Sequence, residues 1–272
     1  MEKRRYALRL AYDGGAFRGF QRQPGLPTVQ ECLERALAHL ASPSRLDVAA
    51  RTDAGVHALG QVVTFSARAA LDPGQLRATV NALTPPALLC LDAAEVGRAV
   101  HARASACSRT YVYLVGWPAP PPLRDYAWSL PDGRSFAAIA APRVDLGLAE
   151  AALRRIVGEH DFGGFARPGE QTARRDVDPR ATVATVLSAS VVPATDMPLL
   201  AFVIEGTRFV RAMVRHVVGT VVSVGIGAAE PAVVSAILGA PRTRYRGVRA
   251  PGRGLTLARV AYRQPLFAPE TI

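Results

Sequence analysis

The sequence predicts an α+β fold made of two mixed units, residues 1–105 and residues 106–272. The chain has 272 residues, of which 49% are hydrophobic, so it can bury the core of one large domain or two medium domains. Strand-like segments alternate with amphipathic helical segments in both halves. Each half contains strands and two helical segments, although neither half is an obvious repeat of the other. This pattern favours a pseudo-twofold architecture.

The first unit is expected to begin with a strand over 6–12 and to continue into a glycine-rich loop over 13–23. Aromatic residues and arginines are interleaved in that loop, which is a mixture that suits a nucleic-acid surface. Arg18 and Gln21 are therefore candidate contacts to a nucleic acid.

Two helices are expected in the first unit. Thr28 and Glu31 have the spacing of a capping box, so a helix is expected over 28–41. Asp72 followed by Pro73 predicts the start of a second helix, because Asp is a good N-cap and Pro fits the first helical turn.

The run 50–58, Ala-Arg-Thr-Asp-Ala-Gly-Val-His-Ala, is expected to be a short turn between strands over 46–50 and 61–65. Gly55 permits the positive φ that a tight connection often needs, so Asp53 is presented at the end of a strand. Catalytic groups tend to lie on such loops. The alternative is that Asp53 only closes the turn as an Asx residue and pairs with Arg51. For His57, a structural role is expected more than a role in the site.

The second unit is expected to begin with a strand over 109–115, followed by a proline-rich stretch, 118–142, that is mostly without regular structure. A polar, arginine-bearing loop is expected to run up to Arg180. The remaining elements expected before the last helix are a helix over 146–158 and strands over 182–192 and 199–205.

A long helix is expected from Arg208 to about Val224, and most of its circumference is apolar. Arg208, Arg211 and Arg215 form a separate stripe at positions i, i+3 and i+7. Such a stripe is either the solvated face of the helix or the lining of a cleft. In the second case, an arginine from this stripe pairs with a carboxylate of the other domain.

The net charge is +11 and the isoelectric point is about 10.5, which favours a polyanionic partner. Lys3 is the single lysine among 33 basic residues. Arginine suits phosphate and base recognition, although nucleotide bias in the coding genome would also replace lysine by arginine. Five arginines near the C-terminus either add phosphate contacts or form a solvated charge run: Arg242, Arg244, Arg246, Arg249 and Arg253.

The sequence lacks the motifs that several classes of enzyme require. The only lysine is at the N-terminus, so no GxxxxGK[ST] phosphate loop exists, and neither GxSxG nor HExxH occurs. We therefore expect no cofactor and no metal. Three widely spaced cysteines, with no CxxC pair, fit a reducing cytoplasm. No apolar run approaches the roughly 18 residues of a membrane span, so no membrane association is expected.

Six groups of residues, in order along the chain, carry a resemblance to a known family: Tyr12-Asp13-Gly14 with Gly19-Phe20-Gln21 and Thr28-Val29-Gln30; residues 51–58; Arg109, Tyr111 and Tyr113; Asp161-Phe162 with Phe165; Phe209 with Met213-Val214-Arg215 and Val218-Gly219; and Ala250-Pro251 with Gly254-Leu255. Together they resemble the TruA family of tRNA pseudouridine synthases over nearly the whole chain. Ala50, Phe17 and His216 depart from the family pattern, where glycine, tyrosine and asparagine are usual.

The resemblance implies a role for each matching residue. Asp53 would be the catalytic aspartate, acting as nucleophile or as base, and Arg215 its ion-pair partner. Tyr111 would stack on the target uracil, Arg51 would help to displace that base, and Leu255 would pack against it. Further substrate contacts are expected from Arg18, Gln21, Arg208 and Arg211.

The resemblance also implies the reaction and the architecture. The chain would isomerise uridine to pseudouridine at positions 38, 39 and 40 of the tRNA anticodon stem-loop. Two ferredoxin-like or RRM-like domains with antiparallel sheets would join across a central basic cleft, in a cytoplasmic homodimer. One alternative is a non-catalytic RNA-binding or RNA-folding protein with the same cleft. Another, a glycosidase with paired carboxylates, lacks a persuasive second acid, because Asp13 and Asp47 are equally well explained as strand-end and turn residues.

Overall fold

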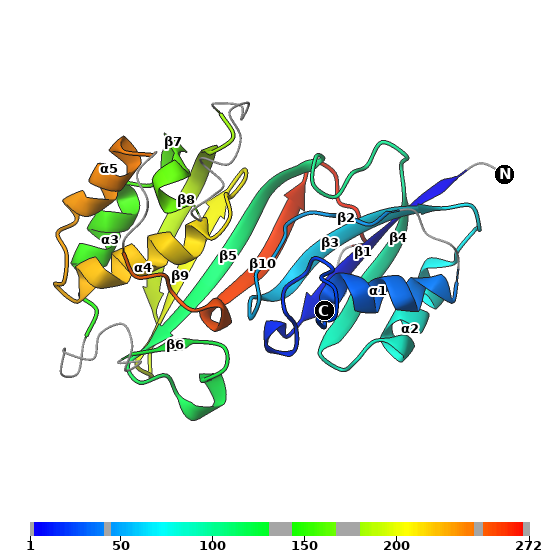
Figure 1. The fold of residues 1–272 in the computed structure, drawn as a ribbon, viewed down its shortest axis with the longest axis horizontal. Helices are drawn as coiled ribbons and strands as arrows, with labels where there is room; N and C mark the ends of the chain where they lie inside the picture. The colour runs from blue at the N-terminus through cyan, green and yellow to red at the C-terminus, as the bar shows by residue number, and fades with distance from the viewer. Residues whose placement is uncertain (1–2, 41–44, 131–142, 167–179, 242–246, 269–272) are drawn as a thin grey trace. The chain divides into compact units, whose positions relative to one another are not determined.

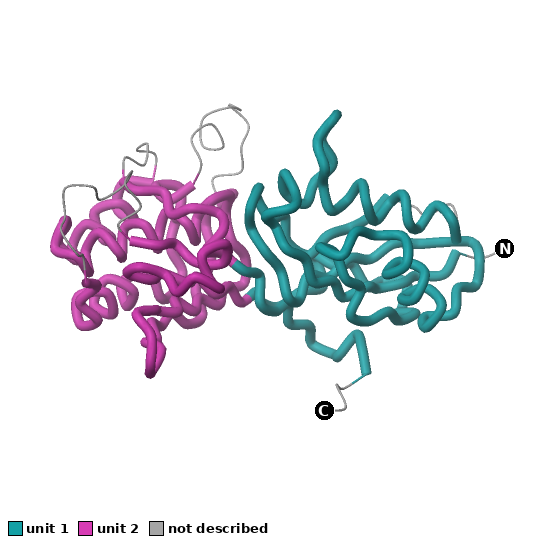
Figure 2. The backbone as a smooth tube through the Cα atoms, turned by 90° about the horizontal axis from the view of Figure 1, so that it is seen from below, with its two compact units in different colours: residues 1–109, 256–272 teal, residues 110–255 magenta. Residues whose placement is uncertain are grey.

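The computed structural model describes residues 3–40, 45–130, 143–166, 180–241 and 247–268, and this part of the chain contains five α-helices and ten strands. The chain forms two compact units (Figure 2): unit 1 comprises residues 1–109 and 256–272, and unit 2 comprises residues 110–255. The expected mixed α+β class is confirmed. The expected division near residue 105 stays a prediction, and the C-terminal segment from residue 256 groups with unit 1.

The sheet of unit 1 has an antiparallel centre, with β1 (Arg4–Tyr12) between β4 (Leu88–Val96) and β3 (His57–Ala67) (Figure 1). Tyr6, Leu8 and Leu10 alternate along β1 and are fully buried, so they form the core face of the sheet. Two short pairings extend the same edge of β3: antiparallel with β2 (Asp47–Val48), and parallel with β10 (Leu255–Tyr262) at Thr256 and Leu257.

Helices α1 (Val29–Ala38) and α2 (Pro73–Leu83) follow the expected caps. The Thr28 side chain accepts from the Glu31 N–H at 3.4 Å, and the Asp72 carboxylate accepts from the Gln75 N–H at 2.8 Å. Apolar positions of both helices are buried, as the amphipathic pattern predicts. The first helix ends at Ala38, and its expected last residue, Ala41, lies outside the described residues.

The other face of the same sheet carries a second, smaller apolar cluster. Its buried members are Ala49, Val62 and Ala102, and the partly buried Val260, Tyr262, Leu266 and Phe267 pack against them. Val62 lies opposite Arg9 in the strand register, and the Arg9 guanidinium carbon is 5.7 Å from the centre of the Phe267 ring. The C-terminal segment therefore covers the face of the sheet that the helices leave open.

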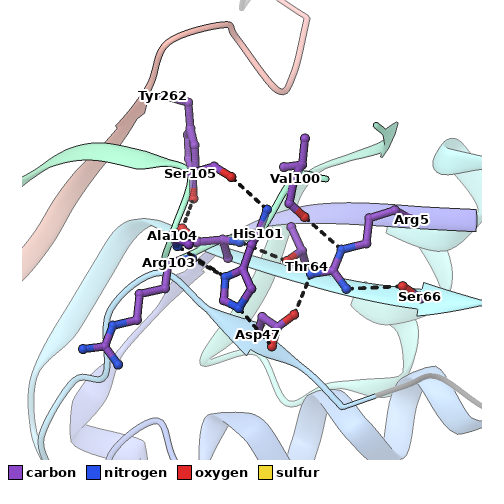
Figure 3. Close-up of polar contacts among 11 residues, drawn as sticks. Arg5, Asp47, Thr64, Ser66, Val100, His101, Arg103, Ala104, Ser105 and Tyr262 are labelled. Carbon is purple, nitrogen blue, oxygen red and sulfur yellow. Dashed lines mark hydrogen bonds and ion pairs between the residues drawn. The ribbon is translucent and has the colours of Figure 1, made fainter. Parts of the chain in front are cut away.

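Asp47 anchors the loop over 97–105 to this face (Figure 3). Its two carboxylate oxygens lie 2.5 Å from Nη2 of Arg5 and 3.5 Å from Nε2 of His101. His101 Nδ1 accepts the N–H groups of Arg103 and Ala104 at 3.1 and 3.3 Å, which leaves the ring proton on Nε2, facing Asp47. Asp47 is the first residue of β2 and not the turn residue that was expected, but its contacts agree with a structural role for this carboxylate.

In unit 2, β5 (Ala106–Gly116) enters from unit 1 and begins the strand order β5, β9 (Leu199–Gly206), β8 (Val183–Pro193), β7 (Gly158–Asp161). The pairings of β9 with β8 and of β8 with β7 are antiparallel. The described part of the proline-rich stretch holds only a 3₁₀ turn (Pro121–Leu123) and β6 (Trp128–Ser129), as expected, and residues 131–142 lie outside the described residues. The helices of this unit are α3 (Leu146–Arg154), α4 (Met213–Gly225) and α5 (Ala232–Gly239).

Two expected helices of unit 2 are shorter than predicted. The helix that begins at Leu146 ends at Arg154, and Gly158, with φ of +107°, opens β7. The long helix begins at Met213 and not at Arg208, because Ala212 has φ of +63°, a left-handed conformation that interrupts the helical path. Five elements were not predicted from the sequence: β4, β6, β7, α5 and β10.

Candidate active site

Asp53 lies on the loop that connects β2 to β3, residues 49–56, called here the Asp53 loop. The loop lies between two strands, as expected, although β2 is only two residues long. Asp53 is half-buried, and its backbone carbonyl accepts the N–H of Val56 at 3.2 Å. Gly55, between them, has φ of +75°, the conformation for which glycine was expected.

The 13–23 loop packs against the Asp53 loop between Gly14 and Phe20. The N–H of Phe20 donates to the carbonyl of Thr52 at 3.1 Å. A Cβ at Gly14 would overlap the backbone of Val56, and a Cβ at Gly19, where φ is +99°, would lie 3.0 Å from the Thr52 carbonyl oxygen. Gly14 and Gly19 are therefore needed for close backbone approach to the Asp53 loop.

Three buried polar side chains, for which the sequence predicted no role, lie behind the Asp53 loop. The hydroxyl oxygens of Tyr12 and Thr52 are 2.8 Å apart, and Gln61 Nε2 donates to the Tyr12 hydroxyl at 3.2 Å. Burial raises the pKa of Tyr12 to about 12. The available signal was a glutamine directly before the buried strand residues Val62–Phe65, since a buried amide needs hydrogen-bond partners.

His57 and Asp13 join the same two loops. The His57 ring is buried, and its Nδ1 lies 3.1 Å from both the N–H of Gly14 and Oδ1 of Asp13. That carboxylate oxygen also accepts the N–H of Gly15 at 2.8 Å. These contacts favour the structural role expected for His57. They also agree with the explanation of Asp13 as a strand-end residue.

Three candidate substrate contacts of unit 1 are exposed loop residues: Arg51, Arg18 and Gln21. The backbone of Arg18 is held in place by two hydrogen bonds. Its N–H donates to the Pro27 carbonyl at 2.8 Å, and its carbonyl accepts a hydrogen bond from the Gln23 side-chain amide at 2.8 Å. Their side chains are open to solvent, as contacts with an RNA require, and their roles stay predictions.

In unit 2, Tyr111 and Tyr113 lie on the same face of β5, two positions apart, and both are buried. The Tyr111 ring meets Phe209 edge to face, with ring centres 5.0 Å apart and planes at 83°. The Tyr113 hydroxyl donates to the Pro251 carbonyl at 2.8 Å. A Cβ at Gly254 would lie 2.5 Å from the Tyr113 ring.

The C-terminal loop, residues 247–254, runs along α4. Arg215 is in the first turn of that helix and is half-buried, and its Nε donates to the Ala250 carbonyl at 2.7 Å. A Cβ at Gly219, one turn further, would overlap the Val248 carbonyl. Leu255 follows the loop at the start of β10 and is 6% exposed.

The predicted arginine stripe on the long helix is wrong. Only Arg215 is helical, because Ala212 interrupts the helical path before it, so Arg208 and Arg211 lie in the segment that leads into α4. Both are exposed, and Arg208 Nη2 donates to the Ala181 carbonyl at 2.7 Å. Phe209, also assigned to that helix, packs on Tyr111 from this segment.

The C-terminal arginine cluster is only partly described. Arg242, Arg244 and Arg246 lie outside the described residues. Arg249 and Arg253 are exposed, and Arg253 Nε donates to the Ala127 carbonyl at 3.2 Å. Both interpretations of the cluster, phosphate contacts and a solvated charge run, therefore stay open.

The candidate residues fall into two sets. Asp53 and Arg51 belong to unit 1, while Tyr111, Arg215 and Leu255 belong to unit 2.

Within the described ranges, no three His, Cys, Asp or Glu side chains come together as a metal ion would require. No helix in this part of the chain is long and apolar enough to cross a membrane.

Comparison with known proteins gives consistent matches over most of the chain. The sequence model of a family described as tRNA pseudouridine synthase matches residues 10–103 and 152–263. A protein of Shouchella clausii (strain KSM-K16) named tRNA pseudouridine synthase A is 34% identical over 270 residues, which cover 98% of this chain and 97% of that protein. Proteins with the same name from Streptococcus agalactiae serotype III (strain NEM316) and Streptococcus suis (strain 05ZYH33) are 34% and 35% identical over 262 residues. Those matches cover 95% of this chain and 95% and 98% of the two proteins.

Proposed function

We propose that this chain, which belongs to the tRNA pseudouridine synthase family, isomerises uridine to pseudouridine at positions 38, 39 and 40 of the tRNA anticodon stem-loop. The reaction breaks the N1–C1′ glycosidic bond, turns the base and joins C5 to C1′. The C5 proton is lost and N1 gains one, so atoms and electrons balance without an oxidant or a phosphate donor. The observation that carries the proposal is the Asp53 loop, which presents one carboxylate between strands of a chain that matches its relatives over nearly its whole length.

Asp53 is the proposed catalytic residue. A carboxylate can attack carbon as a nucleophile, take a proton as a base, or balance positive charge on the sugar. Each of these roles requires the ionised form, and a nearby opposite charge favours that form. Arg215 is the proposed source of that charge. The hydrogen bond from Nε to the Ala250 carbonyl supports this role, because it fixes the orientation of the guanidinium.

The target base must leave its stack before it reacts, which costs on the order of a few kcal/mol. Tyr111 is the proposed stacking platform, because an aromatic ring recovers about 1–3 kcal/mol per stacked base. Its edge contact with Phe209 supports this role by limiting how the ring can turn. Leu255 is proposed to pack against the base, and Arg51 to help displace it. Arg18, Gln21, Arg208 and Arg211 are proposed to contact the RNA, and all four are exposed.

The finer architecture is also a proposal: two ferredoxin-like domains on either side of a basic cleft, assembled as a cytoplasmic homodimer. Unit 1 supports the ferredoxin-like part, since its elements follow the order β1, α1, β2, β3, α2, β4 with β1 between β3 and β4. The net charge of +11 supports a basic RNA-binding surface. Three free cysteines suit a reducing compartment.

Mass-spectrometric mapping of pseudouridine in an unmodified tRNA transcript tests the proposal. The transcript is incubated with the wild-type protein and with Asp53→Asn, without ATP or added metal. Product at positions 38–40 with the wild type alone supports the reaction and its catalyst. Salt-dependent RNA binding without product from either protein would favour the non-catalytic RNA-binding alternative.

A further inference from the structure

Gln61 bonds to four groups behind the Asp53 loop. Its Oε1 accepts the N–H groups of Ala50 and Val62 at 3.3 and 3.2 Å, and its Nε2 donates to the Ala50 carbonyl at 2.7 Å and the Tyr12 hydroxyl at 3.2 Å. The backbone partners have only one polarity each, so they fix which end of the amide is oxygen and which is nitrogen. Gln61 is 0% exposed; its bonds to Tyr12 and Val62 are buried, and its two bonds to Ala50 are partly buried.

The fixed orientation of the Gln61 amide also determines how the Tyr12 hydroxyl is hydrogen-bonded to Thr52. The Gln61 amide nitrogen can only donate, so the Tyr12 oxygen accepts that bond and has its own hydrogen for Thr52 Oγ1, 2.8 Å away. Because burial raises the pKa of Tyr12 to about 12, the hydroxyl keeps that hydrogen at any pH that tRNA survives. Both side chains are buried.

Two of the three residues that precede Asp53 are therefore held at two points each. Ala50 is bonded through its N–H and its carbonyl by Gln61. Thr52 is bonded through its side chain by Tyr12 and through its carbonyl by the N–H of Phe20. Arg51, between them, is exposed. The loop has no regular secondary structure at these positions, so these bonds take the place of a strand ladder in fixing its backbone.

We propose that Tyr12, Thr52 and Gln61 are positioning residues that hold the backbone of Asp53 in its reactive orientation. The proposal rests on the proposed function. A catalytic group must be held within about 0.5 Å of its productive position, and a displacement of about 1 Å can cost on the order of 100-fold in rate. The bonds end at the residue next to Asp53, so their loss affects the carboxylate more than it affects RNA contacts made elsewhere on the protein.

Tyr12→Phe tests the hydroxyl while the ring keeps its packing against Phe17 and Phe20. Tyr6→Phe is the matched control. Tyr6 lies on the same face of β1, is 0% exposed, and its hydroxyl accepts the N–H of Leu71 at 2.8 Å, away from the Asp53 loop. For Tyr12→Phe we expect a single-turnover rate at least about tenfold lower with an unchanged tRNA Kd, and for Tyr6→Phe a rate near that of the wild type.

Thr52 offers a rescue pair. Thr52→Val keeps the shape of the side chain and removes the hydroxyl, so it should lower the single-turnover rate like Tyr12→Phe. Thr52→Ser keeps the hydroxyl and should retain most of the wild-type rate. Equal losses in the Val and Ser variants would assign Thr52 to packing alone and overturn its positioning role.

Amide hydrogen exchange gives a readout that does not depend on activity. In Tyr12→Phe the Ala50, Phe20 and Val56 amides should exchange severalfold faster, while in Tyr6→Phe only the Leu71 region should respond. Unchanged exchange at these three amides, or equal rate losses in Tyr12→Phe and Tyr6→Phe, would overturn the positioning proposal. A wild-type protein that makes no pseudouridine would instead overturn the proposed function, and the exchange data alone would then decide whether the three side chains brace the loop.

Discussion

Arg215 and Ala250 are bonded to each other twice. The Arg215 Nε–H donates to the Ala250 carbonyl at 2.7 Å, and the Ala250 N–H donates to the Arg215 carbonyl at 3.1 Å. The first bond fixes the plane of the guanidinium, because its donors lie in one rigid fork. The second ties the C-terminal loop, which leads to Leu255, to the first turn of α4. One arginine therefore orients both its own charge and the segment before a second candidate residue.

Arg215→Ala should lower the single-turnover rate and move the acid limb of the pH–rate profile to higher pH. The direction follows from the proposed ion pair: the reaction needs an ionised Asp53, and removing the positive charge that is proposed to pair with it disfavours the ionised form. Arg215→Lys keeps the charge but cannot reproduce the planar fork, so we expect a lower rate with an acid limb near the wild-type position. The measurement is the pH dependence of single-turnover rates for the three proteins. An acid limb that stays in place in Arg215→Ala would rule out the ion-pair role.

Tyr111→Phe should retain tRNA affinity, because it keeps the ring that is proposed to stack on the uracil and loses only the hydroxyl. Tyr111→Ala should weaken binding or the rate by the equivalent of about 1–3 kcal/mol, since it removes the stacking surface and the partner of Phe209. Both effects can be measured by filter binding and single-turnover kinetics at one salt concentration. A large loss of affinity in Tyr111→Phe would argue against a role limited to stacking.

The sequence predicted the elements whose signals are local. Thr28 and Asp72 cap α1 and α2 as expected, because a cap depends on residues only three positions away. The Asp53 loop was also predicted, from Gly55 and the strand-like segments on either side. β10 was missed: its pairing with β3 joins positions about 200 residues apart, and no local pattern encodes such a pairing.

The start of α4 and the bracing of the Asp53 loop had weaker signals. Ala212 adopts a left-handed conformation for which the sequence offers no glycine or asparagine, so the apolar run from Phe209 appeared helical. Tyr12 was assigned to a strand and Gln61 to the start of another, but which backbone groups they bond depends on the register of β1 and β3. The sequence alone predicted the candidate catalytic residue, whereas the residues that hold its loop could be identified only from the folded structure.

Gly254→Ala should destabilise unit 2 by about 1–3 kcal/mol, the usual cost of forcing an extra methyl group into a packed site. Its Cβ would lie 2.5 Å from the Tyr113 ring. That ring is 0% exposed, meets Trp128 edge to face, and is bonded through its hydroxyl to Pro251, so it has little room to move. Gly239→Ala is the control, because nothing lies within 4 Å of its Cβ and alanine favours the end of α5. Urea unfolding of both variants checks the difference, and equal stabilities would contradict the packing argument.

The free energy of unfolding should fall as the pH rises above about 9, because several buried acids keep their protons in the folded state. Burial raises the pKa of the Cys90 thiol from 9.0 to about 12 and that of Tyr12 from 10.0 to about 12, and it also raises the pKa of Tyr262. A raised pKa contributes stability that is fully present below the unfolded value. This contribution is lost as the pH climbs towards the folded value, by up to about 1.4 kcal/mol per pH unit for each group.

Cys90→Ala should therefore give a shallower decline of stability between about pH 9 and pH 10.5 than the wild type, whatever its stability at neutral pH. Cys107→Ala is the control, because that thiol is exposed and its removal should leave the slope unchanged. The slopes are obtained from urea unfolding with a reducing agent present, without RNA. Reading the slope separates the ionisation of Cys90 from the packing lost with its sulfur atom, since the cavity costs the same at every pH. Equal slopes of stability against pH in the wild type, Cys90→Ala and Cys107→Ala would contradict the prediction that burial keeps the Cys90 thiol protonated in the folded state.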